Sequence, residues 1–202
     1  MKLYSNRFAP SPRRVRMYAA ERGIALDIVE IDIAAKEHLA PAYLAINPRG
    51  EVPTLERDDG SYLTESLAIC RWLEERQPGP GLFGGDAAQR AAINSCIDAL
   101  MFHLYVPTTH VFRHTHPFWA GRLTQVPAFG EEARKAVLAE YARLDAALAD
   151  REFLVAGRFT MADVVAYTSV DFGKPSKLRP DPAQRHLQRW YEAIGARASA
   201  RA

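Results

Sequence analysis

The sequence predicts an α/β domain followed by an all-helical domain, and three features of the 202-residue chain lead to this fold class. Short segments in which apolar and polar residues alternate, as they do in strands, occur before residue 77. A stretch rich in glycine and proline, QPGPGLFGG at residues 77–85, then breaks the pattern. The segments after it have the apolar spacing of amphipathic helices. We therefore predict domains at residues 1–78 and 87–202, with a linker at 79–86.

The first domain is predicted to have the element order βαβ-α-ββα. A helix between the first two strands requires those strands to be parallel, because an antiparallel pair needs only a short turn. Asp58-Asp59-Gly60 is typical of a hairpin turn between the last two strands. The elements are expected at residues 2–5, 13–22, 26–31, 41–46 and 54–56, in a strand after Gly60, and in a helix that opens at Thr64-Glu65-Ser66.

The second domain is predicted to contain helices only. Asp86 is expected to cap a helix that runs to about Leu104, and Pro107 to kink or interrupt it. Residues 112–126 are expected to form a loop or broken helix. Thr160 and Asp163 have the spacing of a capping box at a helix start. The remaining helices are expected at residues 131–148, 160–170 and 186–198.

Composition and charge exclude several classes of protein. The chain has 26 basic and 24 acidic residues, so no strong field favours binding to nucleic acid or to an anionic membrane. Its two cysteines, Cys70 and Cys96, lie far apart and fit a reducing compartment. The start MKLYSN lacks the apolar core of a signal peptide, and no apolar run reaches the length of a membrane helix. We expect a cytoplasmic protein.

One stretch, Asn47 to Cys70, combines an extended backbone edge with a helix start. Val52 precedes Pro53 at a strand entry, where the bond between them is able to be cis and would turn the Val52 backbone groups outward. Glu65 and Ser66 lie at the start of an apolar helix, whose first N–H groups attract anions. This combination suits a peptide-like anionic ligand. A plain turn and a plain helix cap would explain each feature separately.

The motifs VPTL and TES, at this spacing, resemble the glutathione-binding half of the glutathione transferases. A thioredoxin-like half, a Gly/Pro linker and a helical half with a Thr-x-x-Asp box extend the resemblance over essentially the whole chain. It implies that Val52 pairs with the cysteinyl backbone of glutathione, that Glu65 and Ser66 hold the γ-glutamyl end, and that the protein is a homodimer. The capping box is implied to be a folding element.

The chain departs from the family at its thiol-activating position. Bacterial theta-like and delta-like members read SP-x-x-RRVR before the first helix, whereas residues 9–16 read APSPRRVR. Aligned on RRVR, Ala9 occupies the position of the catalytic serine, and a methyl group cannot donate a hydrogen bond. The resemblance therefore implies a thiolate that is stabilised by other residues.

Three sources of such a group remain open. Ser11 lies two residues on, and would otherwise be a helix N-cap; Ser5, on the first strand, is a weaker candidate. His114 and His116, together with His110, are proton acceptors that act directly or through water. A solvated or capping cluster is the alternative for the histidines. The spacing of His110 and His114 also fits zinc, but no third ligand accompanies them, so we expect no metal.

The remaining ligand contacts follow from the same resemblance. His38 matches a histidine that contacts the glycyl carboxylate of glutathione, whereas Glu51 would repel that carboxylate unless it points away or Arg49 compensates. Arg13 is a further candidate cation. Three aromatic residues would form either an apolar pocket for a hydrophobic co-substrate or part of the core: Phe112, Phe118 and Trp119.

We therefore predict a glutathione transferase of the detoxification type, which conjugates reduced glutathione to small hydrophobic electrophiles. A glutathione-dependent reductase or peroxidase is an alternative, but neither Cys70 nor Cys96 lies in the loop that would carry its active-site cysteine. A non-catalytic glutathione-binding or scaffold protein is the third possibility, and Ala9 favours it.

Overall fold

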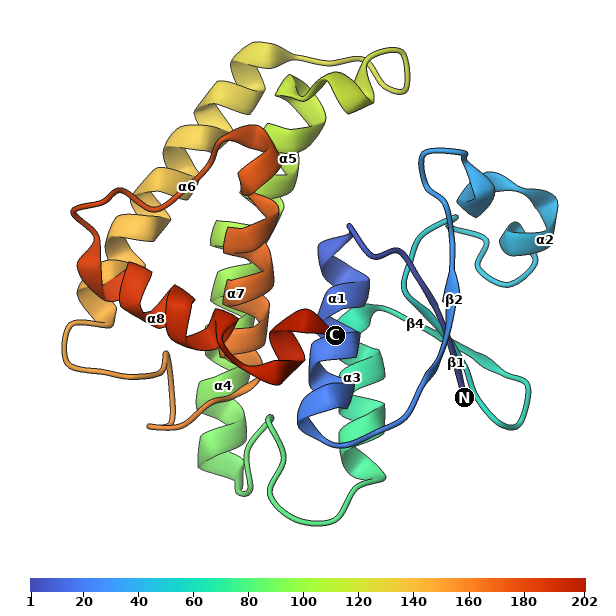
Figure 1. Ribbon diagram of the computed structural model, residues 1–202, viewed down its shortest axis with the longest axis horizontal. Coiled ribbons are helices and arrows are strands. Elements are labelled where there is room, and N and C mark those ends of the chain that lie inside the picture. The colour runs from blue at the N-terminus through green and yellow to red at the C-terminus, as the bar shows by residue number, and fades with distance from the viewer. The chain divides into compact units, whose positions relative to one another are not determined.

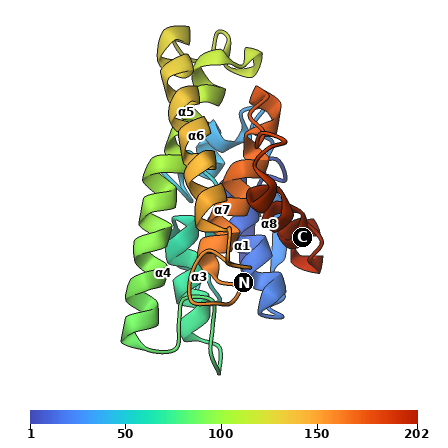
Figure 2. The same ribbon diagram turned by 90° about the vertical axis from the view of Figure 1, so that its left-hand side faces the viewer.

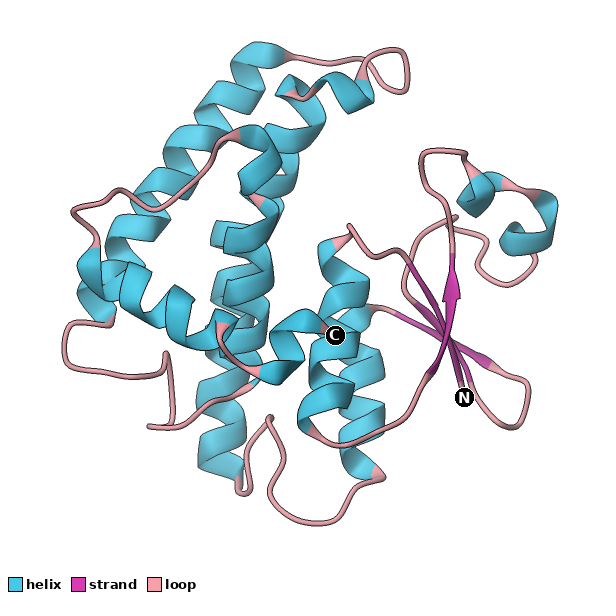
Figure 3. Ribbon diagram, viewed as in Figure 1, coloured by secondary structure: helices cyan, strands magenta, loops and turns pink.

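The computed structural model describes residues 1–202 and divides into two compact units (Figure 1). The first unit comprises Met1–Gly81 together with Ala198–Ala202, and the second comprises Leu82–Arg197. All strands belong to the first unit, and the second is built of helices and loops (Figure 3). The predicted fold class, an α/β domain followed by an all-helical domain, is confirmed.

The first unit is built on a four-stranded sheet in the order β2-β1-β3-β4. Strand β1 is parallel to β2 and antiparallel to β3, which is in turn antiparallel to β4. Helices α1 and α3 lie against each other on one face of this sheet, and α2 lies on the other side (Figure 1). The elements are β1 (Lys2–Ser5), α1 (Pro10–Glu21), β2 (Asp27–Glu30), η1 (Glu37–Leu39), α2 (Pro41–Leu44), β3 (Thr54–Glu56), β4 (Tyr62–Thr64) and α3 (Ser66–Glu75).

Helix α1 begins three residues earlier than the sequence pattern predicted. Ala9 is its N-cap and Pro10 its first residue, a position where the missing proline N–H costs no helical hydrogen bond. Ser11 is therefore the second residue of the helix, and its interpretation as the N-cap is wrong. Leu3 and Leu55 face each other across β1 and β3 and are fully buried, which anchors the sheet beneath the helices.

The second unit consists of eight helical segments. Helices α5 and α6 lie side by side (Figures 1 and 2). No helix of the chain combines the length and apolar character that crossing a membrane requires. The segments are α4 (Ala87–Leu100), η2 (Met101–Tyr105), α5 (Val106–Thr115), η3 (Pro117–Trp119), α6 (Pro127–Ala147), α7 (Met161–Phe172), η4 (Lys174–Ser176) and α8 (Arg185–Gly195). A last turn, η5 (Ala198–Arg201), belongs to the first unit.

The long helix does not end at about Leu104, and Pro107 does not interrupt it: the chain stays helical from α4 into α5 through a widened turn. Segment η2 is a π-helix between α4 and α5. Pro107 has no N–H to offer to the carbonyl one turn back, and such a local loss is a common reason for widening. The predicted loop at residues 112–126 is wrong at its start, because α5 continues to Thr115. There the Thr115 hydroxyl donates to the Val111 carbonyl at 2.8 Å, and Val111 is fully buried.

The capping box at the start of α7 is present, and its acidic residue, Asp163, is a buried acceptor of four hydrogen bonds. Asp163 accepts the Thr160 N–H at 2.9 Å and the Thr160 hydroxyl at 3.1 Å. Its other oxygen accepts the Leu154 N–H at 3.1 Å and the Trp190 indole N–H at 3.0 Å. Asp163 is fully buried, and this burial raises the pKa of its carboxyl group. One side chain thus ties α7, α8 and the preceding loop together.

Candidate functional site

The strand register brings the predicted binding segments of the first unit to one end of the sheet. Tyr4 pairs with Thr54, and Thr54 pairs with Thr64. Because β3 is antiparallel to both neighbours, the segment before Thr54 lies beside the segments that follow Tyr4 and Thr64. The Val52–Pro53 segment, the Glu65–Ser66 helix start and the loop from Ser5 to Ala9 therefore converge.

The segment before β3 presents an unpaired piece of backbone. The Val52–Pro53 peptide bond is cis, and Val52 is half-buried. None of the backbone hydrogen bonds of the chain involves the Val52 N–H or C=O. These two groups are a donor and an acceptor on adjacent sides of one residue, and an extended peptide segment satisfies both.

Two residues that the sequence analysis did not single out hold this segment in place. The Tyr43 hydroxyl donates to the Glu51 carbonyl at 2.7 Å, and the Asn47 amide donates to the same carbonyl at 2.8 Å. Both side chains also reach Thr54 Oγ1, each at 3.2 Å. Burial raises the pKa of the Tyr43 hydroxyl, which remains a donor. These residues lie within twelve positions of one another in the sequence. Their hydrogen bonds nevertheless depend on how the chain folds, so no sequence motif identifies them.

The start of α3 is an uncapped helix N-terminus. Glu65 precedes it with φ +65° and ψ 115°, a combination that L-residues rarely adopt. No side chain caps the first N–H groups of this helix. Ser66, its first residue, is 6% exposed, whereas Glu65 is exposed. Strain of this kind costs about 1–3 kcal/mol and is typical of ligand-binding positions. The helix start therefore suits an anionic group beside the Ser66 hydroxyl.

The cations expected near the ligand are placed differently from one another. Arg49 Nε lies 3.7 Å from Glu51 Oε2, so Arg49 offsets the charge of Glu51, and both side chains are well exposed. His38 lies in η1, after the β2 strand, and is half-buried. Arg13 donates to the Ala200 carbonyl at 2.9 Å, so its guanidinium is engaged within α1 and η5.

The two serine candidates lie on either side of the loop before α1, Ser5 at the end of β1 and Ser11 in the first turn of α1. Ser5 is fully buried, and its hydroxyl oxygen accepts from Arg16 Nη1 at 2.6 Å, which commits the weaker candidate to a structural contact. Ser11 is half-buried in the first turn of α1. Ala9, the N-cap, has no side-chain group to cap that turn. Of the two serines, Ser11 is the one that lies at the positive end of the helix dipole.

The predicted histidines of the second unit act as acceptors of backbone N–H groups. His114 Nδ1 accepts the Val126 N–H at 3.1 Å, and His116 Nδ1 accepts the Phe118 N–H at 3.1 Å. A neutral imidazole that accepts at Nδ1 carries its proton on Nε2. In this arrangement His114 and His116 offer Nε2–H donors, whereas the sequence analysis expected proton acceptors. The alternative interpretation of the histidines, as a capping cluster, agrees with the backbone hydrogen bonds that their Nδ1 atoms accept.

His110 lies beside His114 on the same helix, with ring centroids 6.4 Å apart, and packs against Phe129 at 5.0 Å. Burial, followed by the neighbouring His114 and Arg113, lowers the pKa of the His110 imidazole and favours its neutral form. No third histidine, cysteine or carboxylate stands with these rings in a metal-binding group.

The three aromatic residues singled out in the sequence form one half-buried cluster in the second unit. The Phe112 ring stacks near Phe118 at 6.0 Å and meets the edges of Trp119 at 6.1 Å and Phe172 at 5.1 Å. Arg113 lies over the Trp119 ring at 5.5 Å. The cluster is a half-buried group of apolar rings, the kind of side chain that predominates in the pockets of small apolar ligands.

Neither cysteine is suited to redox chemistry. Cys70 lies inside α3, is fully buried, and burial raises the pKa of its thiol. Burial raises the pKa of the Cys96 thiol to about 11, so this cysteine is also a thiol at neutral pH. A reactive cysteine requires the opposite shift.

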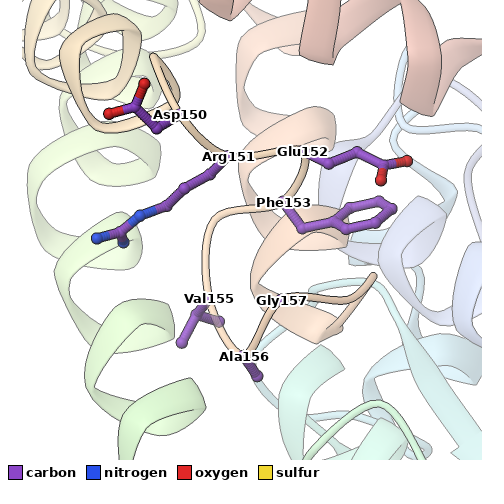
Figure 4. Close-up of a pocket in the computed structure, with 7 residues that line it drawn as sticks. All are labelled: Asp150, Arg151, Glu152, Phe153, Val155, Ala156 and Gly157. Carbon is purple, nitrogen blue, oxygen red and sulfur yellow. The ribbon is translucent and has the colours of Figure 1, made fainter.

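A surface hollow of about 360 Å³ lies apart from all these residues, in the loop between α6 and α7. Figure 4 shows that its lining is made by the loop itself. The lining residues are Asp150, Arg151, Glu152, Phe153, Val155, Ala156 and Gly157. None of the predicted site residues is among them, so the hollow adds nothing to the candidate site.

Known protein families match both halves of the chain. Residues 8–76 match the family model described as the glutathione S-transferase N-terminal domain, and residues 105–198 match the glutathione S-transferase C-terminal domain. The chain is 30% identical to glutathione S-transferase F10 of Arabidopsis thaliana over 209 residues, which cover 98% of this chain and 94% of the relative.

Two solved structures are similar over their whole length. A glutathione S-transferase domain-containing protein of Marinobacter aquaeolei is 32% identical with a TM-score of 0.92, covering 98% of this chain and 99% of the other. Gtt2 of Saccharomyces cerevisiae is 28% identical with a TM-score of 0.93, covering 100% and 99%.

Proposed function

The chain belongs to the glutathione S-transferase family, and from this premise we propose that it is a glutathione transferase that conjugates reduced glutathione to small hydrophobic electrophiles. The observation that carries the proposal is the convergence, at one end of the sheet, of the open Val52 backbone with the uncapped α3 start. One donor–acceptor pair and one anion site at neighbouring positions match the cysteinyl backbone and the γ-glutamyl carboxylate of glutathione.

We assign the binding contacts accordingly. The Val52 N–H and C=O pair with the cysteinyl residue, beside Pro53. The first N–H groups of α3 and the Ser66 hydroxyl hold the γ-glutamyl carboxylate, and Glu65 pairs with the γ-glutamyl ammonium. His38 binds the glycyl carboxylate. Glu51 lines the same end, its charge offset by Arg49 at 3.7 Å.

Thiolate stabilisation is assigned to donors and not to a base. A thiol with a pKa of about 8.5 is only a few per cent ionised at neutral pH, so the site must lower that value. We place the chain in the theta-like and delta-like branch, with Ala9 in the position of the catalytic serine. We assign the hydroxyl donor to Ser11, at the positive end of the α1 dipole. His114 and His116 are candidates for the same role, each through its Nε2–H.

The electrophile class follows from the aromatic cluster. Phe112, Phe118 and Trp119 offer ring faces and edges that suit small apolar electrophiles, as a transferase of the detoxification type requires. A reductase or peroxidase is disfavoured by the buried Cys70 and by the raised pKa of Cys96. A non-catalytic glutathione-binding protein is the second candidate, because Ala9 at the N-cap supplies no hydroxyl. In the cell we expect a cytoplasmic homodimer.

The test is a difference-absorbance titration of bound glutathione against pH. In the wild type we expect binding, with a bound thiol that ionises well below its free pKa of about 8.5. Ser66→Ala should weaken binding about tenfold or more, because it removes a hydrogen bond to a charged group. Ser61→Ala is the matched control, since Ser61 lies in the hairpin turn at the other end of β3 and β4.

Three outcomes separate the candidates. Binding with a lowered thiol pKa supports the transferase. Binding with an unmoved thiol pKa supports the non-catalytic alternative. If the wild type does not bind glutathione, or if Ser66→Ala behaves like Ser61→Ala, the assignment of Val52, Glu65 and Ser66 is wrong.

A further inference from the structure

One guanidinium group holds the whole loop that leads into α1. Arg16 Nη1 donates to the Ser5 hydroxyl at 2.6 Å and to the Asn6 carbonyl at 3.3 Å, and Arg16 Nη2 donates to the Arg7 carbonyl at 3.3 Å. The Asn6 carbonyl also accepts the Ala9 N–H at 3.2 Å. Arg16 therefore binds three consecutive residues and shares an acceptor with the turn that positions Ala9.

The same helix face receives the last residues of the chain described here. Arg16 Nε donates to the Ala202 carbonyl at 3.3 Å, and Arg13 Nη2 donates to the Ala200 carbonyl at 2.9 Å. The Ser199 hydroxyl donates to Glu21 at 2.5 Å. Ser199 and Ala200 are 3% and 7% exposed. Segment 198–202 is thus packed along α1, nearly 200 residues away in sequence from the loop that Arg16 holds.

We propose that Arg16 and residues 198–202 form a brace that positions the Ser5–Ala9 loop, and with it the thiol-activating end of α1. The proposal rests on the proposed glutathione site. Ala9 has only a methyl group, so no side chain at that position anchors the loop by contact with the ligand. The position of the first turn of α1 must therefore be set by the backbone of residues 5–9.

The chemistry of arginine explains why this position needs it. The guanidinium is a rigid planar fork with five N–H donors, and four hydrogen bonds from Arg16 run to four different residues: Ser5, Asn6, Arg7 and Ala202. A lysine has the same charge but a single nitrogen with three donors, which cannot reach all four of these acceptors. Burial lowers the pKa of the Arg16 guanidinium, which nevertheless stays charged. In this assignment Arg16 is a positioning residue and does not touch glutathione.

Arg16→Lys and a chain that stops at Arg197 test the brace from its two ends. Both should raise the pKa of the glutathione-bound thiol toward its free value and lower kcat about tenfold, with little change in KM for glutathione, because small misplacements of catalytic groups reduce rates steeply. Arg22→Lys is the matched control. Arg22 is the C-cap residue of the same helix and also donates to two backbone carbonyls, those of Pro78 and Pro80, but it holds no part of the loop.

Amide hydrogen exchange at Phe8 and Ala9 provides a readout that needs no ligand. Both N–H groups are bonded within the loop, to Asn6 Oδ1 at 3.0 Å and to the Asn6 carbonyl. We expect faster exchange there in Arg16→Lys and in the shortened chain, and no change in Arg22→Lys. Ser199→Ala supplies a milder variant that loses only the bond to Glu21.

The two readouts distinguish the failure of the brace from the failure of the proposed function. If the wild type does not bind glutathione but exchange quickens as expected, the loop is braced and the glutathione site is wrong. If the wild type binds glutathione with a lowered thiol pKa, and neither that pKa nor the exchange rates change in the Arg16 and shortened variants, the brace is overturned.

Discussion

The two units use their polar groups in opposite ways. In the first unit, the groups that define the candidate site lack hydrogen-bond partners within the protein: the Val52 backbone has none, and no side chain caps α3. In the second, the conspicuous polar groups are committed within the unit, His114 and His116 to backbone N–H groups and Asp163 to four donors. A polar group that is already hydrogen-bonded within the protein stabilises the fold. A polar group without a partner, at the end of the sheet, is available to bind a ligand.

This comparison predicts that substitutions in the second unit reduce stability first and substitutions in the first unit reduce ligand binding first.

The largest expected effect is that of Asp163→Ala on stability. The substitution leaves the Leu154 N–H, the Trp190 indole N–H and two Thr160 donors without their buried acceptor. Each unsatisfied donor costs about 1–3 kcal/mol, so we expect the free energy of unfolding to fall by about 4 kcal/mol. Urea denaturation followed by circular dichroism measures this. Asp98→Ala, on the exposed face of α4, is the control and should change stability by no more than about 0.5 kcal/mol.

An equal effect of the two substitutions would show that the hydrogen bonds to Asp163 are not needed for stability. The comparison of units would then lose its strongest example of a committed group.

The second prediction concerns the three proposed donors. Replacing Ser11 by Ala and His114 and His116 by Asn together should lower the conjugation rate about 100-fold, because positioned proton-donating groups contribute at least that much. Asn retains an acceptor for the Val126 and Phe118 N–H groups, so the fold should persist. The rate with a standard electrophile is measured at saturating glutathione.

The Ser11→Ala variant alone then separates the contribution of the first unit to the conjugation rate from that of the two histidines in the second. If Ser11→Ala alone reproduces the loss, the histidines are caps only, and the division between a site-forming first unit and a committed second unit is sharpened. If the triple variant keeps the wild-type rate, the thiolate is stabilised by none of these side chains.

The binding half was easier to predict from sequence than the activating half, for a physical reason. Val52, Pro53, Glu65 and Ser66 act mainly through backbone conformation, which a proline and a helix start specify locally. The role of a histidine depends on which nitrogen is engaged, and that is set by Val126 and Phe118, which no spacing rule connects to it. The role of Arg16 could not be predicted for the same reason, because one of its acceptors lies 186 residues away in the sequence.

Fold prediction failed in a similar way, at element ends. The start of α1 at Pro10 was missed because Ser11 resembles a cap, although a proline at the first position is the stronger signal. Residues 112–115 were expected to be loop because the stretch 112–126 mixes histidine, proline, tryptophan and glycine. In the structure Thr115 bonds back to Val111, and buried packing of Val111 overrides the weak helical propensity of the segment.

The smallest expected effect is also the most specific to the first unit. Glu65 has φ +65°, which a glycine adopts without the strain that a Cβ atom imposes. Glu65→Gly and Glu65→Ala both remove the carboxylate, so both should weaken glutathione binding, by about tenfold. Only the glycine relieves the backbone, so Glu65→Gly should be about 1 kcal/mol more stable than Glu65→Ala. Isothermal titration and urea denaturation measure the two quantities. A glycine variant that gains stability while losing affinity would show that strain at the α3 start is retained for the ligand, whereas equal stability of the two variants would mean that the positive φ carries no cost in this fold.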